Sequence, residues 1–385
     1  MSAAELRQAL ELINAGRSSE AEAALQAILN RDAASADAWY LLGFAFGSRR
    51  RLVEARRALE RSLAIRPGFP MAWHTLGNVL VDQGETGLAE RAYRQALELR
   101  GDDVDSWYNL ALLLQGASRL DEAIAAYRRA LELRPALAPA HNNLANALKS
   151  QGRIAEAMVH YAEAVRLAPD MADALSNYGN VLREEGRVQE AVPLLERATK
   201  LKPRSAQALN NLGIAYFGVG RFEDAEASYR RALAVVPDFD EARNNLGNAL
   251  LSLGRTQEAE ACYREVLDRR PDHADAHSNR ALALQELGRE DEAIASYRRA
   301  LELKPDHADA LNNAGFLLQE QGRRQEAMTL YRRSLDANPR FARAAYNLGI
   351  AHLMELEFDR GWPLSELRYN TVPPVAVARP FAIPR

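Results

Sequence analysis

The chain has 385 residues, of which 48% are apolar and 26% are charged, and its formal net charge is −3. This near-neutral balance argues against nucleic acid or an anionic membrane surface as the principal partner. The single cysteine, Cys262, excludes an intrachain disulfide, and no uncharged apolar run approaches the ~18 residues of a membrane span. Because the N-terminus also lacks a signal-peptide pattern, we expect a soluble, cytoplasmic protein.

Residues 1–35 are expected to form a degenerate capping repeat at the N-terminal end. Gly16 and Ala21 match a 34-residue period that becomes regular at Ala36, whereas Ala33 replaces the proline found later in that register. Terminal units of a stacked array face water on one side, so an atypical first unit is expected.

Residues 36–341 contain nine regular units without a gap or an insertion. We number each unit from slot 1, which is Ala36 in the first. A proline closes each unit except where Gly101 stands in its place, and most units carry a glycine in the middle. Proline cannot continue a helix, and glycine accepts the left-handed conformation that ends one. Each unit is therefore predicted to be helix, tight turn, helix, tight turn.

Small and large residues alternate at fixed slots in these units. Slot 8 is glycine or alanine, slot 20 is alanine throughout, slot 4 begins as tryptophan, and slot 24 is mostly tyrosine. This pattern resembles the tetratricopeptide repeat, a helix–turn–helix unit of 34 residues. The resemblance implies an all-α fold, a right-handed α-solenoid superhelix of about ten stacked units. Slot 7 departs from the pattern at Arg280 and Ala314, and a buried arginine needs a partner or a route to solvent.

Slot 6 holds an uninterrupted run of asparagines in the later units: Asn109, Asn143, Asn177, Asn211, Asn245, Asn279, Asn313 and Asn347. At 100° per residue, slots 2, 6, 9 and 13 lie opposite the core-facing slots 4, 7, 8 and 11. The family resemblance places this face on the inner, concave surface. Slot 9 adds Asn146, Asn180 and Asn248 to the candidate site, after Asn78 and among large apolar residues.

Two interpretations of the asparagine run remain open. An amide can bond both the C=O and the N–H of an extended chain, whatever its side chains. Packed helices lie about 8–10 Å apart and a strand rises about 3.3 Å per residue, so one asparagine would meet roughly every third residue. Alternatively, asparagine at this slot ties neighbouring repeats together. Asn142, Asn210, Asn244 and Asn312 stand beside the run and favour the peptide-binding interpretation.

No sequence motif indicates a metal, cofactor or catalytic site. His273 and His277 are four residues apart and His307 recurs one period after His273, but no cysteine or further histidine nearby completes a zinc site. No Ser-His-Asp arrangement, phosphate loop or His-Glu-x-x-His run is visible. We therefore predict a chain that is not itself an enzyme and binds no cofactor.

The period ends after Met354. Residues 342–370 are expected to form a partial repeat and a capping helix, and residues 371–385 an extended proline-rich tail. Phe358 to Trp362, followed by Arg379-Pro380-Phe381, resembles the junction that precedes the transferase domain in bacterial relatives of O-linked N-acetylglucosamine transferase. That family's repeat arm also carries an asparagine ladder. Its catalytic half has no counterpart in these 385 residues.

Three functions follow from these patterns. The first is a protein-interaction module that binds extended or disordered polypeptide in an asparagine-lined groove. The second is the substrate-recognition arm of an O-glycosyltransferase whose catalytic domain lies elsewhere. The third is an assembly scaffold for folded partners or for copies of itself, anchored by Trp362, Phe381 and Ile383.

Overall fold

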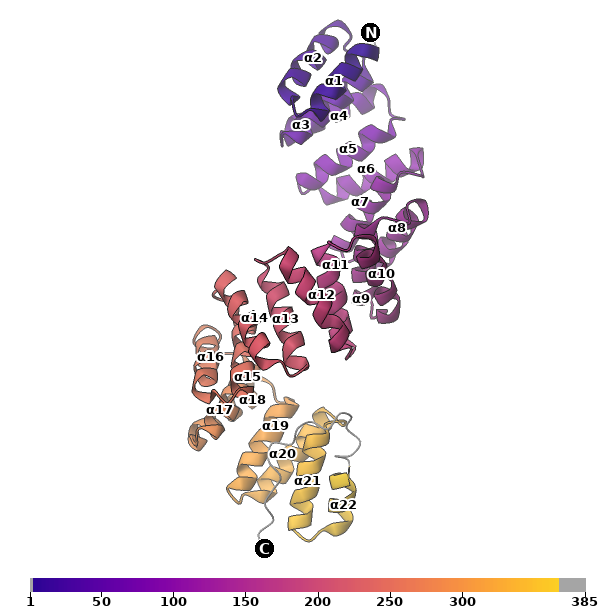
Figure 1. Ribbon diagram of the computed structural model, residues 1–385. Coiled ribbons are helices and arrows are strands. Elements are labelled where there is room, and N and C mark those ends of the chain that lie inside the picture. Colours follow the sequence, from indigo (N-terminus) through magenta and orange to yellow (C-terminus); the bar gives the residue numbers. More distant parts are fainter. Residues whose placement is uncertain (1–2, 367–385) are drawn as a thin grey trace. The chain divides into compact units, whose positions relative to one another are not determined.

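The computed structural model describes residues 3–366 and contains twenty-two α-helices and no strand within them (Figure 1). The chain divides into two compact units, Met1–Leu201 and Lys202–Arg385. In each unit, consecutive helices pack as antiparallel pairs, and each pair packs on the next. The predicted all-α stack of helix pairs is confirmed.

Unit 1 contains twelve helices: α1 (Ala3–Asn14), α2 (Ser18–Arg31), α3 (Ala36–Ser48), α4 (Leu52–Ile65), α5 (Pro70–Asp82), α6 (Thr86–Leu99), α7 (Val104–Gly116), α8 (Leu120–Leu133), α9 (Ala138–Ser150), α10 (Ile154–Leu167), α11 (Ala172–Glu184) and α12 (Val188–Leu201). Unit 2 contains ten: α13 (Ala206–Gly218), α14 (Phe222–Val235), α15 (Asp240–Ser252), α16 (Thr256–Arg269), α17 (Ala274–Glu286), α18 (Glu290–Leu303), α19 (Ala308–Glu320), α20 (Arg324–Ala337), α21 (Ala342–Met354) and α22 (Phe358–Glu366).

The turn inside each repeat uses a left-handed residue at slot 15. Most repeats place glycine there, as at Gly152 with φ 74° and Gly254 with φ 74°. Arg50, Ser118 and Leu356 adopt the same conformation without being glycine. This conformation crowds a β-carbon, so these three turns carry local strain that glycine avoids.

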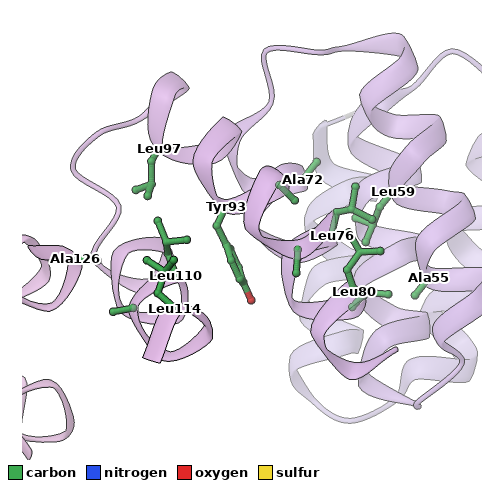
Figure 2. Close-up of a cluster of buried hydrophobic side chains, with 14 of the residues drawn as sticks. Ala55, Leu59, Ala72, Leu76, Leu80, Tyr93, Leu97, Leu110, Leu114 and Ala126 are labelled. Carbon is green, nitrogen blue, oxygen red and sulfur yellow. The ribbon is translucent and has the colours of Figure 1, made fainter. Parts of the chain in front are cut away.

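The core of each repeat is built on a close approach of its two helices. A β-carbon on Gly247 would lie 2.5 Å from the ring of Tyr263. Glycine at slot 8 therefore leaves room for the slot-24 ring. Figure 2 shows Tyr93 of α6 between Leu76 and Leu80 of α5 and Leu110 and Leu114 of α7. Each tyrosine ring removes about 150–250 Å² from water, which makes it the largest single contribution to its repeat's core.

Slot 4 has a role beyond filling space. Trp39, Trp73 and Trp107 each donate their indole N–H to the carbonyl six residues earlier, at 2.8–3.0 Å. His141 and His277 make the same contact to Pro135 and Pro271. These carbonyls lie in the turns between repeats, at proline or at Ala33 and Gly101 in its place, so slot 4 satisfies a group left without a helical partner.

Candidate functional site

The first helices of the repeats form the inner row of each unit. In unit 1, α3 contacts α5, α7 contacts α9, and α9 contacts α11. In unit 2, α13, α15, α17, α19 and α21 contact one another in succession. Within residues 3–366 the second helices make no comparable contact with each other. Because first helices approach more closely than second helices, they line the concave side of each unit.

The slot-6 asparagines lie in the seams between neighbouring first helices. Seven are half-buried and Asn211 is buried. Four donate their side-chain Nδ2 to the Oδ1 of the slot-5 asparagine one repeat earlier, namely Asn177 to Asn142 (3.0 Å), Asn245 to Asn210 (3.1 Å), Asn279 to Asn244 (3.2 Å) and Asn347 to Asn312 (2.9 Å). We call these four bonds the inter-repeat ties.

Other members of the run use different partners. Asn109 donates to the side-chain oxygen of Asn78 at 3.0 Å, and Asn143 donates to the hydroxyl of Tyr108 at 3.0 Å. Asn313 accepts from the adjacent Asn312 at 3.0 Å, and Asn211 accepts from Gln207 at 3.1 Å. Every asparagine of the run therefore makes a side-chain hydrogen bond within its own unit.

The slot-5 asparagines serve the ties. Asn142, Asn210, Asn244 and Asn312 are buried, and each accepts a tie from the following repeat. These four asparagines therefore have a structural role, and the support for peptide binding that the sequence assigned to them stays a prediction. A tie uses one of the three hydrogen-bonding sites of the slot-6 amide. In the described part of the chain, Oδ1 of Asn177, Asn245, Asn279 and Asn347 has no partner.

The slot-9 asparagines are engaged differently, because they face the core tyrosines. Oδ1 of Asn78, Asn146 and Asn248 accepts from the hydroxyls of Tyr93, Tyr161 and Tyr263 at 2.6–2.7 Å. Asn180 lacks such a donor because Leu195 occupies slot 24 of its repeat, and its buried Oδ1 has no partner among the described residues. The predicted binding residues Asn146 and Asn248 thus have their oxygen committed to the core.

The remaining slots of this face are a mixture of apolar and acidic residues. Phe44 and Leu112 at slot 9 remain 38% and 40% exposed on their helices. Several acidic residues at slots 2 and 13 have partners, including Asp105 with Arg134 at 3.5 Å and Glu184 with Lys149 at 2.8 Å. The face is therefore polar and partly apolar, with much of its charge neutralised locally.

Arg280, the slot-7 exception, finds its partner across the repeat boundary. Its Nε donates to the carboxylate of Glu260 at 2.9 Å. Glu260 is buried, with only 5% of the residue exposed. The pair joins α16 to α17. The buried carboxylate of Glu260, one repeat earlier, thus compensates the charge of Arg280. The two residues are 20 positions apart, and the 34-residue period did not indicate that they would pair.

The histidines considered as metal ligands have structural contacts. His273 and His307 cap α17 and α19 by accepting from Ala276 and Ala310 N–H. His307 also lies 2.9 Å from Asp275, and its proximity holds the pKa of that carboxyl below its usual range. No group of three or more potential metal ligands occurs among residues 3–366. Burial raises the pKa of the Cys262 thiol to about 11, which keeps it protonated and unreactive.

One arrangement that sequence spacing did not reveal brings serine, histidine and aspartate together. Ser106 donates to Asp103 at 2.6 Å and lies 2.7 Å from Nδ1 of His74. Ser106 is completely buried, and its proton goes to the aspartate instead of to the histidine. A nucleophilic serine must be accessible and must give its proton to a neighbouring base. Ser106 meets neither condition, so the cluster is a structural link between α5 and the start of α7.

Comparison with known families decides what these repeats are. A tetratricopeptide repeat family model matches residues 6–70, 74–138 and 244–308, which is more than half of the chain. Three further tetratricopeptide models match residues 138–171, 170–238 and 284–349. The chain belongs to the tetratricopeptide repeat family. It is therefore a tetratricopeptide protein-interaction module. Separately, no helix within residues 3–366 is long and apolar enough to cross a membrane.

Solved structures resemble this chain at low sequence identity. A protein from Parabacteroides merdae is 17% identical, with a TM-score of 0.55, and the match covers 64% of this chain and 98% of that one. Yeast Tom70 is 13% identical, with a TM-score of 0.50 over 96% and 92%. YrrB, described as having an unusual peptide-binding site, is 25% identical over 49% and 96%, with a TM-score of 0.45. The tetratricopeptide chain matches no curated protein.

Proposed function

We propose that this tetratricopeptide protein binds extended or disordered polypeptide segments along the first helices of its repeats, with the slot-6 asparagines as backbone contacts. The observation that carries the proposal is the set of inter-repeat ties. Each tie holds one N–H of the amide and so orients its plane. The carbonyl oxygen, together with the second N–H, is then left for a ligand in Asn177, Asn245, Asn279 and Asn347.

A preorganised amide favours binding because less side-chain freedom is lost when the ligand arrives. A free asparagine would have to be ordered by the peptide itself. The tie therefore serves both earlier interpretations, since it stabilises the stack and also presents the amide. At a helix spacing of about 8–10 Å, the tied amides of successive repeats would meet roughly every third residue of an extended chain.

The experiment compares two matched triple variants in unit 2. The ladder variant carries Asn245→Ala, Asn279→Ala and Asn347→Ala. The acceptor variant carries Asn210→Ala, Asn244→Ala and Asn312→Ala. Both variants remove the same three ties, whereas only the ladder variant removes the groups proposed to contact peptide. Peptide binding is measured by fluorescence anisotropy with a randomised library of extended peptides, and stability by urea unfolding.

Both variants are expected to lose about 1 kcal/mol per tie, and the acceptor variant somewhat more, because Asn210 and Asn312 also donate to Glu241 and Asn313. Only the ladder variant should lose most of its peptide affinity, while the acceptor variant should weaken binding less because its ladder amides remain but are less ordered. Equal affinities for the ladder variant and the wild-type chain would overturn the proposal. Equal losses of peptide affinity in both variants would show that the asparagines act only through the stability of the stack.

An assembly scaffold is a second candidate, favoured by exposed apolar residues at the end of the described chain. Trp362 and Phe358 on α22 are 57% and 50% exposed. The other predicted anchors, Phe381 and Ile383, and the tail at 371–385 lie outside the described residues. Truncation after Met354 should then abolish oligomers or partner capture in light-scattering measurements, and an unchanged mass would refute this role.

The remaining finer predictions stay proposals. The role as a transferase arm depends on Arg379-Pro380-Phe381, which lies outside the described residues. We expect no sugar transfer by the isolated chain when it is incubated with a nucleotide-sugar and acceptor peptides, and turnover would contradict this. The capping assignment of residues 1–35, the partial repeat at 342–370 and a cytoplasmic location are likewise predictions.

A further inference from the structure

Unit 2 contains a cavity of about 360 Å³ where one repeat lacks its usual slot-7 leucine. Seven of the ten slot-7 residues from Leu42 to Leu348 are leucine, and they fill the space between the second helix of one repeat and the next repeat. At Ala314 this side chain is absent. The cavity lies there, between α18, α19 and α20.

The walls of the cavity are mostly aliphatic, with the ring of Tyr297 among them. Ile294 and Leu301 of α18, Leu318 of α19 and Leu330 of α20 line it and are only half-buried. In addition, α18 contacts α19 less extensively than α14 contacts α15. The cavity is more than twice the ~150 Å³ of an engineered apolar cavity that binds benzene, and lies in the lower range of ligand sites at about 300–1,000 Å³.

The mouth of the cavity is cationic. Arg298, Arg323 and Arg333 line it, together with one carboxylate, Glu302. Arg323 is paired with Glu326 at 2.7 Å, Arg333 donates to the Pro305 carbonyl at 3.1 Å, and Glu302 is held by Arg299 at 3.0 Å. Arg298 has no ion pair with any residue that the structure describes.

The free charge of Arg298 distinguishes it from the arginines at the same slot of earlier repeats. Arg94 and Arg128 pair with the glutamates 28 residues later at 2.9 and 3.2 Å, and Arg264 lies 3.6 Å from Glu260. Glu260, the partner of Arg264, stands at slot 21 of its repeat. In the Arg298 repeat slot 21 is Ile294, so Arg298 lacks the corresponding carboxylate. An uncompensated guanidinium therefore stands beside an aliphatic cavity.

We propose that this cavity binds a small aliphatic carboxylate, with its chain in the place of the missing leucine and its carboxylate on Arg298. Guanidinium groups bind carboxylates through paired, charge-assisted hydrogen bonds, and the aliphatic walls gain from covering an apolar chain. The site is separate from the asparagine face, because it is formed by the second helices α18 and α20 together with slots 7, 10 and 11 of α19.

The test titrates the full chain with sodium octanoate by calorimetry, with octylamine as a ligand of opposite charge and similar chain. Octanoate should bind and shift the methyl resonances of Ile294, whereas octylamine should displace it only weakly. Ala314→Leu refills the cavity and should abolish octanoate binding while raising the Tm by a few degrees. Arg298→Gln should weaken octanoate binding about tenfold, the effect of losing one charged hydrogen-bond partner.

Arg264→Gln is the matched control, since it removes an arginine from the same slot one repeat earlier and should leave octanoate binding unchanged. Absence of octanoate binding, equal binding of octanoate and octylamine, or full binding by Ala314→Leu would each overturn the proposal. Arg298→Gln alters an exposed side chain, so it decides the question even if Ala314→Leu does not fold.

Discussion

The buried pair Arg280–Glu260 allows a sharp test of how this array tolerates charge in its core. Glu260→Ala would leave the guanidinium of Arg280, whose side chain is 23% exposed, without its 2.9 Å partner. Breaking a fully buried pair costs about 3–5 kcal/mol, and the residual exposure of Arg280 reduces this to about 2–3 kcal/mol. Arg280→Leu should cost less, because Glu260 keeps Arg264 at 3.6 Å.

The chain itself supplies the apolar replacement. Ile124 and Leu144 occupy the same two slots in unit 1, and both are buried. The double variant Glu260→Ile, Arg280→Leu should therefore recover the loss, and be neutral or more stable than the wild-type chain by about 1–2 kcal/mol. Urea unfolding, with hydrogen exchange of α16 and α17 to localise the change, measures this. A double variant as unstable as Glu260→Ala would refute the reasoning.

Further predictions use contrasts within the chain. Tyr263→Phe should cost about 1 kcal/mol because its hydroxyl donates to Asn248 at 2.7 Å. Tyr297→Phe should cost nothing measurable in the same unfolding assay, since its buried hydroxyl has no partner within residues 3–366. Burial lowers the pKa of His160, and the charge of His141, 2.9 Å away between ring nitrogens, lowers it further. Below the ordinary value of 6.5 the unfolded chain therefore binds protons that the folded chain does not, so stability present above pH 6.5 should fall toward pH 5. His160→Gln should flatten this dependence of Tm on pH, and an unchanged slope would assign it to other groups.

The architecture could be predicted from the sequence because its signals are local and repeated. Proline ends every unit but the one with Gly101, glycine at slot 15 adopts the left-handed turn in most of them, and slots 8, 20 and 24 recur together. These features act within one helix pair, so a single period contains them all. Nine consecutive copies of this pattern then make an accidental match implausible.

The side-chain pairings between repeats were harder to predict from the sequence, because they depend on how neighbouring repeats are offset. A tie joins residues 35 apart, one more than the period, and this offset comes from the packing of successive first helices. The cluster of His74 and Ser106 spans 32 residues for the same reason. Helix geometry placed slot 6 opposite the core, but it could not distinguish an open groove floor from a seam between helices.

Backbone recognition is the central claim, and peptide chemistry tests it most directly. The best-binding peptide of about 12 residues, long enough to span roughly four asparagines, is compared with a scrambled version and with a version N-methylated at every third residue. Scrambling retains the backbone groups, whereas N-methylation removes the N–H donors that the amide oxygens of Asn245, Asn279 and Asn347 are proposed to accept. We predict similar affinity for the scrambled peptide and a loss of about tenfold or more on N-methylation. Strong binding by the methylated peptide, with loss on scrambling, would show side-chain recognition and contradict the proposal.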